Sequence, residues 1–101
     1  MRNAVVIDAV RSPIARAHAE TGWFRDVRAD DLSAQIMRAL VDRTGIDPTL
    51  IDDVQWGCVQ QQGEQGFNIA RNATLIAGLP IETAATTVNR LCASSLQAVN
   101  N

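Results

Sequence analysis

The chain has 101 residues, enough for one small domain, and 47% of them are hydrophobic and 20% charged. This composition excludes a disordered, collagen-like or low-complexity protein. The formal net charge is −2 and the arginines are scattered, so neither nucleic acid nor an anionic membrane is expected as a partner.

No targeting or membrane signal is evident in the sequence. The apolar runs are too short for a transmembrane helix, and the start lacks the apolar core and cleavage site of a signal peptide. The two cysteines, Cys58 and Cys92, do not make a disulfide framework, and they lack the spacing of metal ligands. We therefore expect a cytoplasmic protein without a bound metal.

A strand is predicted at residues 4–10, directly at the start of the fold. The segment is rich in Val and Ile and broken only by Asp8, as expected for a strand covered on both faces. Pro13 ends it because proline has no N–H for a strand ladder. A polar loop that carries His18 follows.

The first helix is the clearest predicted element. Asp30 or Asp31 can cap its start and interact with the positive end of its dipole. Gly45 suits the left-handed position just past its end. Its apolar stripe consists of Leu32, Ile36, Met37, Leu40 and Val41.

Two further strands and two further helices alternate along the rest of the chain. Strands are expected at residues 53–60 and 84–89, and helices at residues 67–77 and from Ser94 onward. The alternation predicts an α/β fold with a mostly parallel sheet and right-handed crossovers. One face of the helix at residues 67–77 is formed by Ile69, Ala73 and Ile76.

Cys92 lies at the junction between the last strand and the last helix. The unpaired N–H groups and the positive dipole end of a helix N-terminus favour a thiolate, and such N–H groups can also stabilise an oxyanion. Ligands of parallel α/β sheets bind beyond the carboxyl ends of the strands, where Cys92 is expected. The position therefore predicts a nucleophilic cysteine.

A free cysteine is more commonly a small buried hydrophobic residue than a nucleophile. Cys58 fits that alternative, because it is predicted in the middle of a strand between Gly57 and Val59. Cys92 differs from it in its position and in its small neighbours, which would let an acyl group approach closely: Ala93, Ser94 and Ser95.

Several segments of the chain resemble the thiolase family. Residues 88–99 read VNRLCASSLQAV and are similar to the family's acyl-enzyme signature. Residues 4–14, AVVIDAVRSPI, resemble its opening strand and turn, and residues 28–32, RADDL, resemble the start of its first helix. Residues 56–61, WGCVQQ, and 64–71, EQGFNIAR, most resemble the degradative 3-ketoacyl-CoA thiolases of bacterial fatty-acid oxidation complexes. The resemblance covers the whole chain.

The resemblance implies that residues 1–101 are the first part of a thiolase N-terminal domain, cut within the helix after Cys92. Cys92 would attack the 3-keto carbon of a 3-ketoacyl-CoA, release acetyl-CoA and carry the acyl group until a second CoA removes it. The backbone N–H of Cys92 would be an oxyanion donor. Coenzyme A enters as a co-substrate, no cofactor is expected to stay bound, and no residue is assigned to coenzyme A.

Thiolases also use a histidine that activates the sulfur atoms and a second cysteine that acts as acid and base. His18, the only histidine, matches no family motif, and Cys58 does not match the second cysteine, which lies near the far end of the family's chains. We therefore expect His18 to have a loop role and the fragment alone to be inactive.

Three alternatives to degradative thiolysis remain: biosynthetic acetoacetyl-CoA formation, a ketosynthase-like condensation, and a non-catalytic thiolase-like remnant. The resemblance also implies a homodimer or larger oligomer, with a complex with a multifunctional β-oxidation subunit as a further option. The sequence downstream of Asn101 would distinguish the alternatives.

One loop and a few other side chains are expected to have roles in packing, contacts or ion pairs. The loop at residues 60–65 reads as a solvated loop by itself, whereas the resemblance favours a dimer contact near the active site. Trp56 is expected in core or interface packing. Arg11 and Arg71 are candidates for structural ion pairs.

Overall fold

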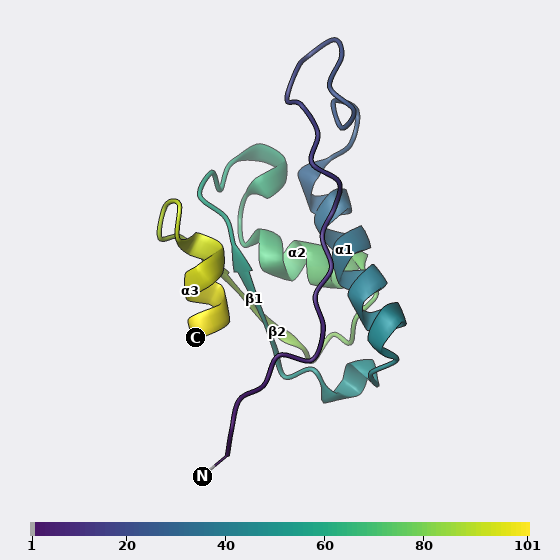
Figure 1. Cartoon of the computed structure of the whole chain (residues 1–101), viewed down its shortest axis with the longest axis vertical. Coiled ribbons are helices and arrows are strands. Elements are labelled where there is room, and N and C mark those ends of the chain that lie inside the picture. The colour runs from purple at the N-terminus through teal and green to yellow at the C-terminus, as the bar shows by residue number, and fades with distance from the viewer. Residues whose placement is uncertain (1) are drawn as a thin grey trace.

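The computed structural model describes residues 2–101 and contains three helices around two strands (Figure 1). In chain order the elements are α1 (Ala29–Thr44), a 3-10 turn (Pro48–Leu50), β1 (Asp53–Gly57), a second 3-10 turn (Gly63–Gln65), α2 (Ile69–Ile76), β2 (Ala84–Val88) and α3 (Ser94–Asn100). No helix among residues 2–101 is long and apolar enough to cross a membrane.

Strands β1 and β2 form a parallel pair connected through α2. Their register pairs Asp53 with Ala84 and Gly57 with Val88. Helix α3 lies on one side of the pair and α2 on the other, with α1 packed beyond α2 (Figure 1). This arrangement confirms the predicted α/β class and the parallel pairing, although both strands end earlier than predicted, at Gly57 and Val88.

The strand predicted at residues 4–10 does not form. This segment runs beside α1 as an extended chain without strand pairing (Figure 1). An apolar run becomes a strand only when a neighbouring backbone completes its hydrogen bonds, and β1 pairs with β2 alone among the described residues. The segment is instead held by an ion pair between Asp8 Oδ2 and Arg43 Nε at 2.9 Å.

Helix α1 starts two residues earlier than its predicted cap. Arg28 is the N-cap residue and supplies no side-chain capping bond, so the prediction that Asp30 or Asp31 caps the helix is wrong. Both aspartates lie in the first turn, where their charge complements the helix dipole. Gly45 ends the helix in the left-handed region, at φ 66°, as predicted.

The hydrophobic core lies between α1, α2, β1 and the segment that directly follows α2. Its buried members are Ala34, Met37, Ala73, Ala77 and Leu79, and the half-buried Trp56 packs against them. Alanine at the helix contacts lets α1 and α2 approach closely. The predicted inward face of α2 is confirmed for Ile69 and Ala73, whereas Ile76 is 51% exposed and lines the open cleft between α1 and α2.

Candidate functional site

Cys92 lies in the turn that joins the carboxyl end of β2 to the start of α3. It precedes the N-cap residue Ala93 by one position, and it is an exposed free cysteine. The predicted location at a strand–helix junction, beyond the end of a parallel strand, is therefore confirmed. Its thiol is open to a ligand rather than packed as a small hydrophobic residue.

The turn is sharp because Leu91, directly before Cys92, adopts the left-handed region at φ 50°. Only two non-glycine residues among those described have a positive φ, and the other is Asn68. The left-handed conformation costs an L-residue roughly 1–2 kcal/mol, so contacts in the folded chain must maintain it. One of them is a bond from the Leu91 N–H to Asn89 Oδ1 at 2.9 Å.

Among residues 90–94 of this turn, every backbone N–H except that of Cys92 is engaged. Those of Arg90, Leu91, Ala93 and Ser94 donate to groups within the turn, at 2.9 to 3.1 Å. The N–H of Cys92 has no acceptor among residues 2–101. A free N–H beside an exposed thiol can donate to an oxygen of a molecule that the sulfur attacks.

Cys58 lies near the same edge of the sheet but has a different environment. Its N–H donates to the Val88 carbonyl at 3.0 Å, and its half-buried Sγ lies 3.7 Å from the carbonyl of Gln60. Because β1 ends at Gly57, Cys58 follows the strand, and the prediction that it lies mid-strand is wrong.

His18 does not lie near Cys92. It is exposed, and its Nδ1 accepts from the N–H groups of Glu20 and Thr21 at 3.1 and 3.2 Å. Its loop extends beyond the start of α1 and does not approach the turn before α3 (Figure 1). These bonds give His18 the loop role that the sequence predicts.

Arg71 has a structural role, but not the ion pair that was expected. Its guanidinium donates to the carbonyls of Thr83 and Ile81, at 2.7 and 2.9 Å, and so holds the segment between α2 and β2. Arg11 forms no ion pair within residues 2–101. The Arg71 guanidinium therefore has main-chain carbonyls as its hydrogen-bond acceptors, and not the carboxylate that an ion pair would require.

The glutamine-rich loop at residues 60–65 contributes a contact that sequence reasoning missed. Glu64 Oε1 accepts from the N–H of Ala29 at 2.9 Å and thereby caps α1 from 35 positions away. No local pattern predicts such a cap, because capping signals are sought within a few residues of the helix start. Apart from Gln65 and Gly66, which are half-buried, the loop is solvent-exposed in this chain.

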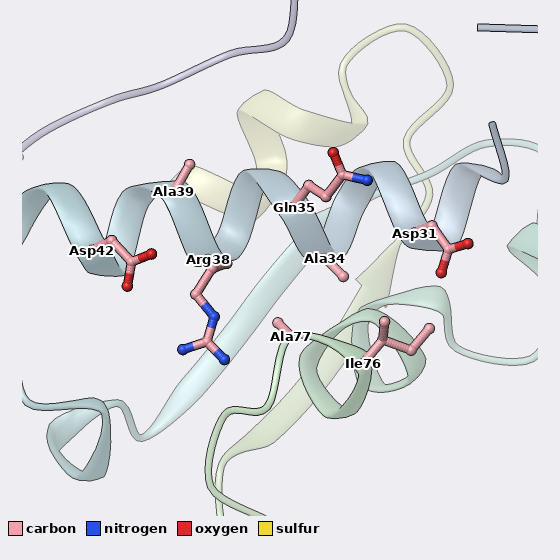
Figure 2. A pocket seen from close by; sticks show the side chains of 8 residues that line it. All are labelled: Asp31, Ala34, Gln35, Arg38, Ala39, Asp42, Ile76 and Ala77. Carbon is pink, nitrogen blue, oxygen red and sulfur yellow. The ribbon is translucent and has the colours of Figure 1, made fainter.

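The cleft between α1 and α2 does not contain the candidate nucleophile. It has a volume of about 480 Å³ and is lined by Asp31, Ala34, Gln35, Arg38, Ala39, Asp42, Ile76 and Ala77. Figure 2 shows Arg38 extending from α1 toward the end of α2, beside Ala77. Its lining includes no thiol and no histidine, and we assign it no chemistry.

Comparison with known proteins places almost all of the chain in one family. Residues 4–101 match the family described as "Thiolase, N-terminal domain". The chain is 56% identical to a 3-ketoacyl-CoA thiolase of Aliivibrio salmonicida and to one of Photobacterium profundum, and 57% identical to one of Yersinia pestis. Each alignment covers 100% of this chain and 26% of the relative, so the chain spans about a quarter of the length of these relatives.

Proposed function

The chain belongs to the thiolase family, and from that premise we propose that the full-length protein is a 3-ketoacyl-CoA thiolase with Cys92 as its nucleophile. By the full-length protein we mean this chain together with a counterpart of the relatives' remaining length. Such a protein is an acyltransferase that divides one carbon–carbon cleavage between two transfers of an acyl group.

One observation carries the assignment of Cys92. Its exposed thiol belongs to the residue whose backbone N–H, alone among those of residues 90–94, has no acceptor within residues 2–101. A carbonyl carbon attacked by Sγ would bring its oxygen within reach of that N–H as negative charge develops. Cys58 offers no equivalent, because its N–H is already bonded to Val88.

In the first step, the Cys92 thiolate attacks the 3-keto carbon and forms a carbon–sulfur bond, and the carbonyl electron pair moves to oxygen. Collapse of this alkoxide breaks the bond between carbons 2 and 3, and the departing carbanion takes a proton to become acetyl-CoA. In the second step, the thiol of free CoA attacks the thioester, giving a shortened acyl-CoA and regenerating Cys92.

Residues 2–101 supply the nucleophile and an oxyanion donor but no base beside the thiol. The chain's only histidine is in the loop before α1, and Cys58 is bonded to the backbone beyond β1. Deprotonation of the thiol and protonation of the carbanion therefore require groups from the remaining length of the protein.

The test is the first turnover of the full-length protein with a 3-ketoacyl-CoA. The wild-type enzyme is expected to release a burst of acetyl-CoA equal to the number of active sites, and Cys92→Ser to give none. Cys58→Ser is the matched control and is expected to keep the burst. An unchanged burst from Cys92→Ser would rule out Cys92 as the nucleophile.

We further propose that the enzyme works in the degradative direction in fatty-acid β-oxidation, as the name 3-ketoacyl-CoA thiolase of its relatives suggests. Thiolysis of medium- and long-chain 3-ketoacyl-CoA should exceed acetoacetyl-CoA synthesis. A protein that made acetoacetyl-CoA but did not cleave longer substrates would support the biosynthetic alternative.

We also propose a cytoplasmic homo-oligomer, with the loop at residues 60–65 at its subunit contact. The proposal predicts a dimeric or larger mass for the full-length protein by light scattering. It also predicts weaker association when Gln61 and Gln62 are replaced by glutamate. A monomer with full activity would contradict it.

A further inference from the structure

Ser94 is the first residue of α3, and its side chain is buried within the turn that carries Cys92. Only 4% of the residue is exposed. Its Oγ accepts from the N–H of Arg90 at 2.9 Å and donates to the carbonyl of Leu91 at 2.6 Å. The N–H of Ser94 donates to the same Leu91 carbonyl at 3.1 Å. One side chain thus binds the backbone on both sides of the peptide bond between Arg90 and Leu91.

These bonds hold the conformation that is otherwise unfavourable. With φ of 50°, Leu91 would tend to return to a negative φ, which would rotate its carbonyl and with it the N–H of Cys92. Since Ser94 binds that carbonyl and Arg90 before it, the rotation would break three hydrogen bonds. The orientation of the Cys92 N–H therefore depends on Ser94.

Gly57 supports the same turn from the strand side. A Cβ placed on Gly57 would lie 2.5 Å from the Ser95 nitrogen and 2.7 Å from the Ser94 carbonyl carbon, closer than side-chain atoms approach backbone. The absence of a side chain at the end of β1 thus lets the start of α3 pack directly on the strand. Any larger residue would have to displace Ser94.

We propose that Ser94, with Gly57 beneath it, is a positioning residue that aims the Cys92 N–H at the oxyanion of the acylation step. The proposal rests on the function proposed above and adds to it the part of the turn that sets the geometry. Ser94 does not touch the substrate; it acts through the backbone of Leu91 and Cys92.

Two reactions of Cys92 separate this role from a purely structural one. Acylation by a 3-ketoacyl-CoA builds an oxyanion, whereas alkylation by iodoacetamide displaces iodide at a saturated carbon and builds none. In the full-length protein, Ser94→Ala should slow acylation by about tenfold to a hundredfold, because losing one oxyanion donor outright costs about a hundredfold to a thousandfold. Alkylation of Cys92, followed by peptide mass spectrometry, should stay within about twofold of wild type.

Ser95→Ala is the matched control, because Ser95 is exposed and its hydroxyl makes no bond to residues 2–101. It should acylate at the wild-type rate. Gly57→Ala is an independent second variant that moves Ser94 without removing its hydroxyl. It should likewise slow acylation and leave alkylation nearly unchanged. If Ser94→Ala does not fold, the Gly57→Ala result decides.

Wild-type acylation in Ser94→Ala, or in Gly57→Ala where the serine variant does not fold, would overturn the proposal. An equal slowing of acylation and alkylation in that variant would also overturn the proposal, because it would mean that Ser94 has only a general structural role. Failure of the proposed function gives a different result: Cys92→Ala would then still form the acyl-enzyme, whatever Ser94 does.

Discussion

Leu91 shows how a single residue can shape the site without taking part in the chemistry. Its side chain is 68% exposed and contributes little to packing, yet its backbone conformation determines where Cys92 points. Unfavourable backbone conformations persist only where surrounding bonds outweigh their cost, and they are frequent at functional sites. Here the bonds come from Asn89 and Ser94.

A β-branched residue at position 91 tests the importance of that conformation. Leu91→Val should destabilise the turn by on the order of 1 kcal/mol, because β-branched residues tolerate the left-handed region poorly. Leu91→Gly, which adopts that region freely, should keep the turn. We expect slower single-turnover acylation in the valine variant only. Equal rates in the two variants would mean that the conformation of Leu91 does not matter.

At this scale the sequence predicts part of the site. The position of Cys92 follows from the order of strand and helix, and its nucleophilic role from the motif around it. The contribution of Ser94 does not follow, because it depends on a turn geometry in which one hydroxyl reaches both Arg90 and Leu91. Cys58 was misplaced because its strand, predicted to reach residue 60, ends three residues earlier, at Gly57.

Among the elements, α1 depends most on groups that its own sequence pattern does not reveal. Its first N–H is bound by Glu64, and its first turn contains an ion pair in which Arg28 donates to both carboxylate oxygens of Asp30, at 3.0 and 2.9 Å. The Asp30 carboxylate also accepts from the N–H of Asp31. The hydrogen bonds from Arg28 are the main reason that the pKa of Asp30 lies below its ordinary value.

This pKa has a consequence for stability in acid. A carboxyl with a lowered pKa in the folded state stabilises that state above its unfolded pKa of about 4, and the effect is lost as the pH falls through the folded pKa. Asp30→Asn should therefore lower the melting temperature of the full-length protein at pH 7. The difference from wild type should shrink below about pH 4.

Asp31→Asn is the control, because Asp31 lies in the same turn but is exposed and its carboxylate makes no hydrogen bond to residues 2–101. It removes only the weaker interaction with the helix dipole, so it should lower the melting temperature at pH 7 less than Asp30→Asn does. A melting difference for Asp30→Asn that stayed constant down to pH 2 would contradict the assignment to the ionised carboxyl.

The remaining elements show where local patterns suffice. The parallel pair and the three helices follow from alternation and helical periodicity, and Gly45 ends α1 as its residue type predicts. The segment at residues 4–10 has the composition of a strand but finds no partner strand within residues 2–101, because pairing depends on the whole fold rather than on composition.

For the whole molecule, the main feature is the amount of apolar surface left exposed. Val5, Val6 and Ile7 are 77, 83 and 78% exposed, and Phe67 is 99% exposed. Contiguous apolar surface is uncommon on soluble monomers and marks places where other protein covers it. The relatives are about four times as long as the chain. We therefore expect the rest of the full-length protein, or a second subunit, to cover these residues.

The purified 101-residue chain is therefore expected to fold poorly and to lack thiolysis. It should bind a hydrophobic dye, associate at micromolar concentration and melt without a cooperative transition. Calorimetry and a thiolysis assay on the chain alone check this. A sharp melt of a monomer, or robust turnover, would show that the missing partners are not needed.

The central claim is that the acyl group is carried by Cys92, and peptide mass spectrometry of the trapped intermediate tests it most directly. The full-length protein is mixed with a 3-ketoacyl-CoA in the absence of free CoA, quenched in acid and digested. The acyl mass should appear on the peptide that begins at Leu91 and contains Cys92, and it should disappear when CoA is added before the quench. An acyl group on the Cys58 peptide, or none on either, would contradict the account.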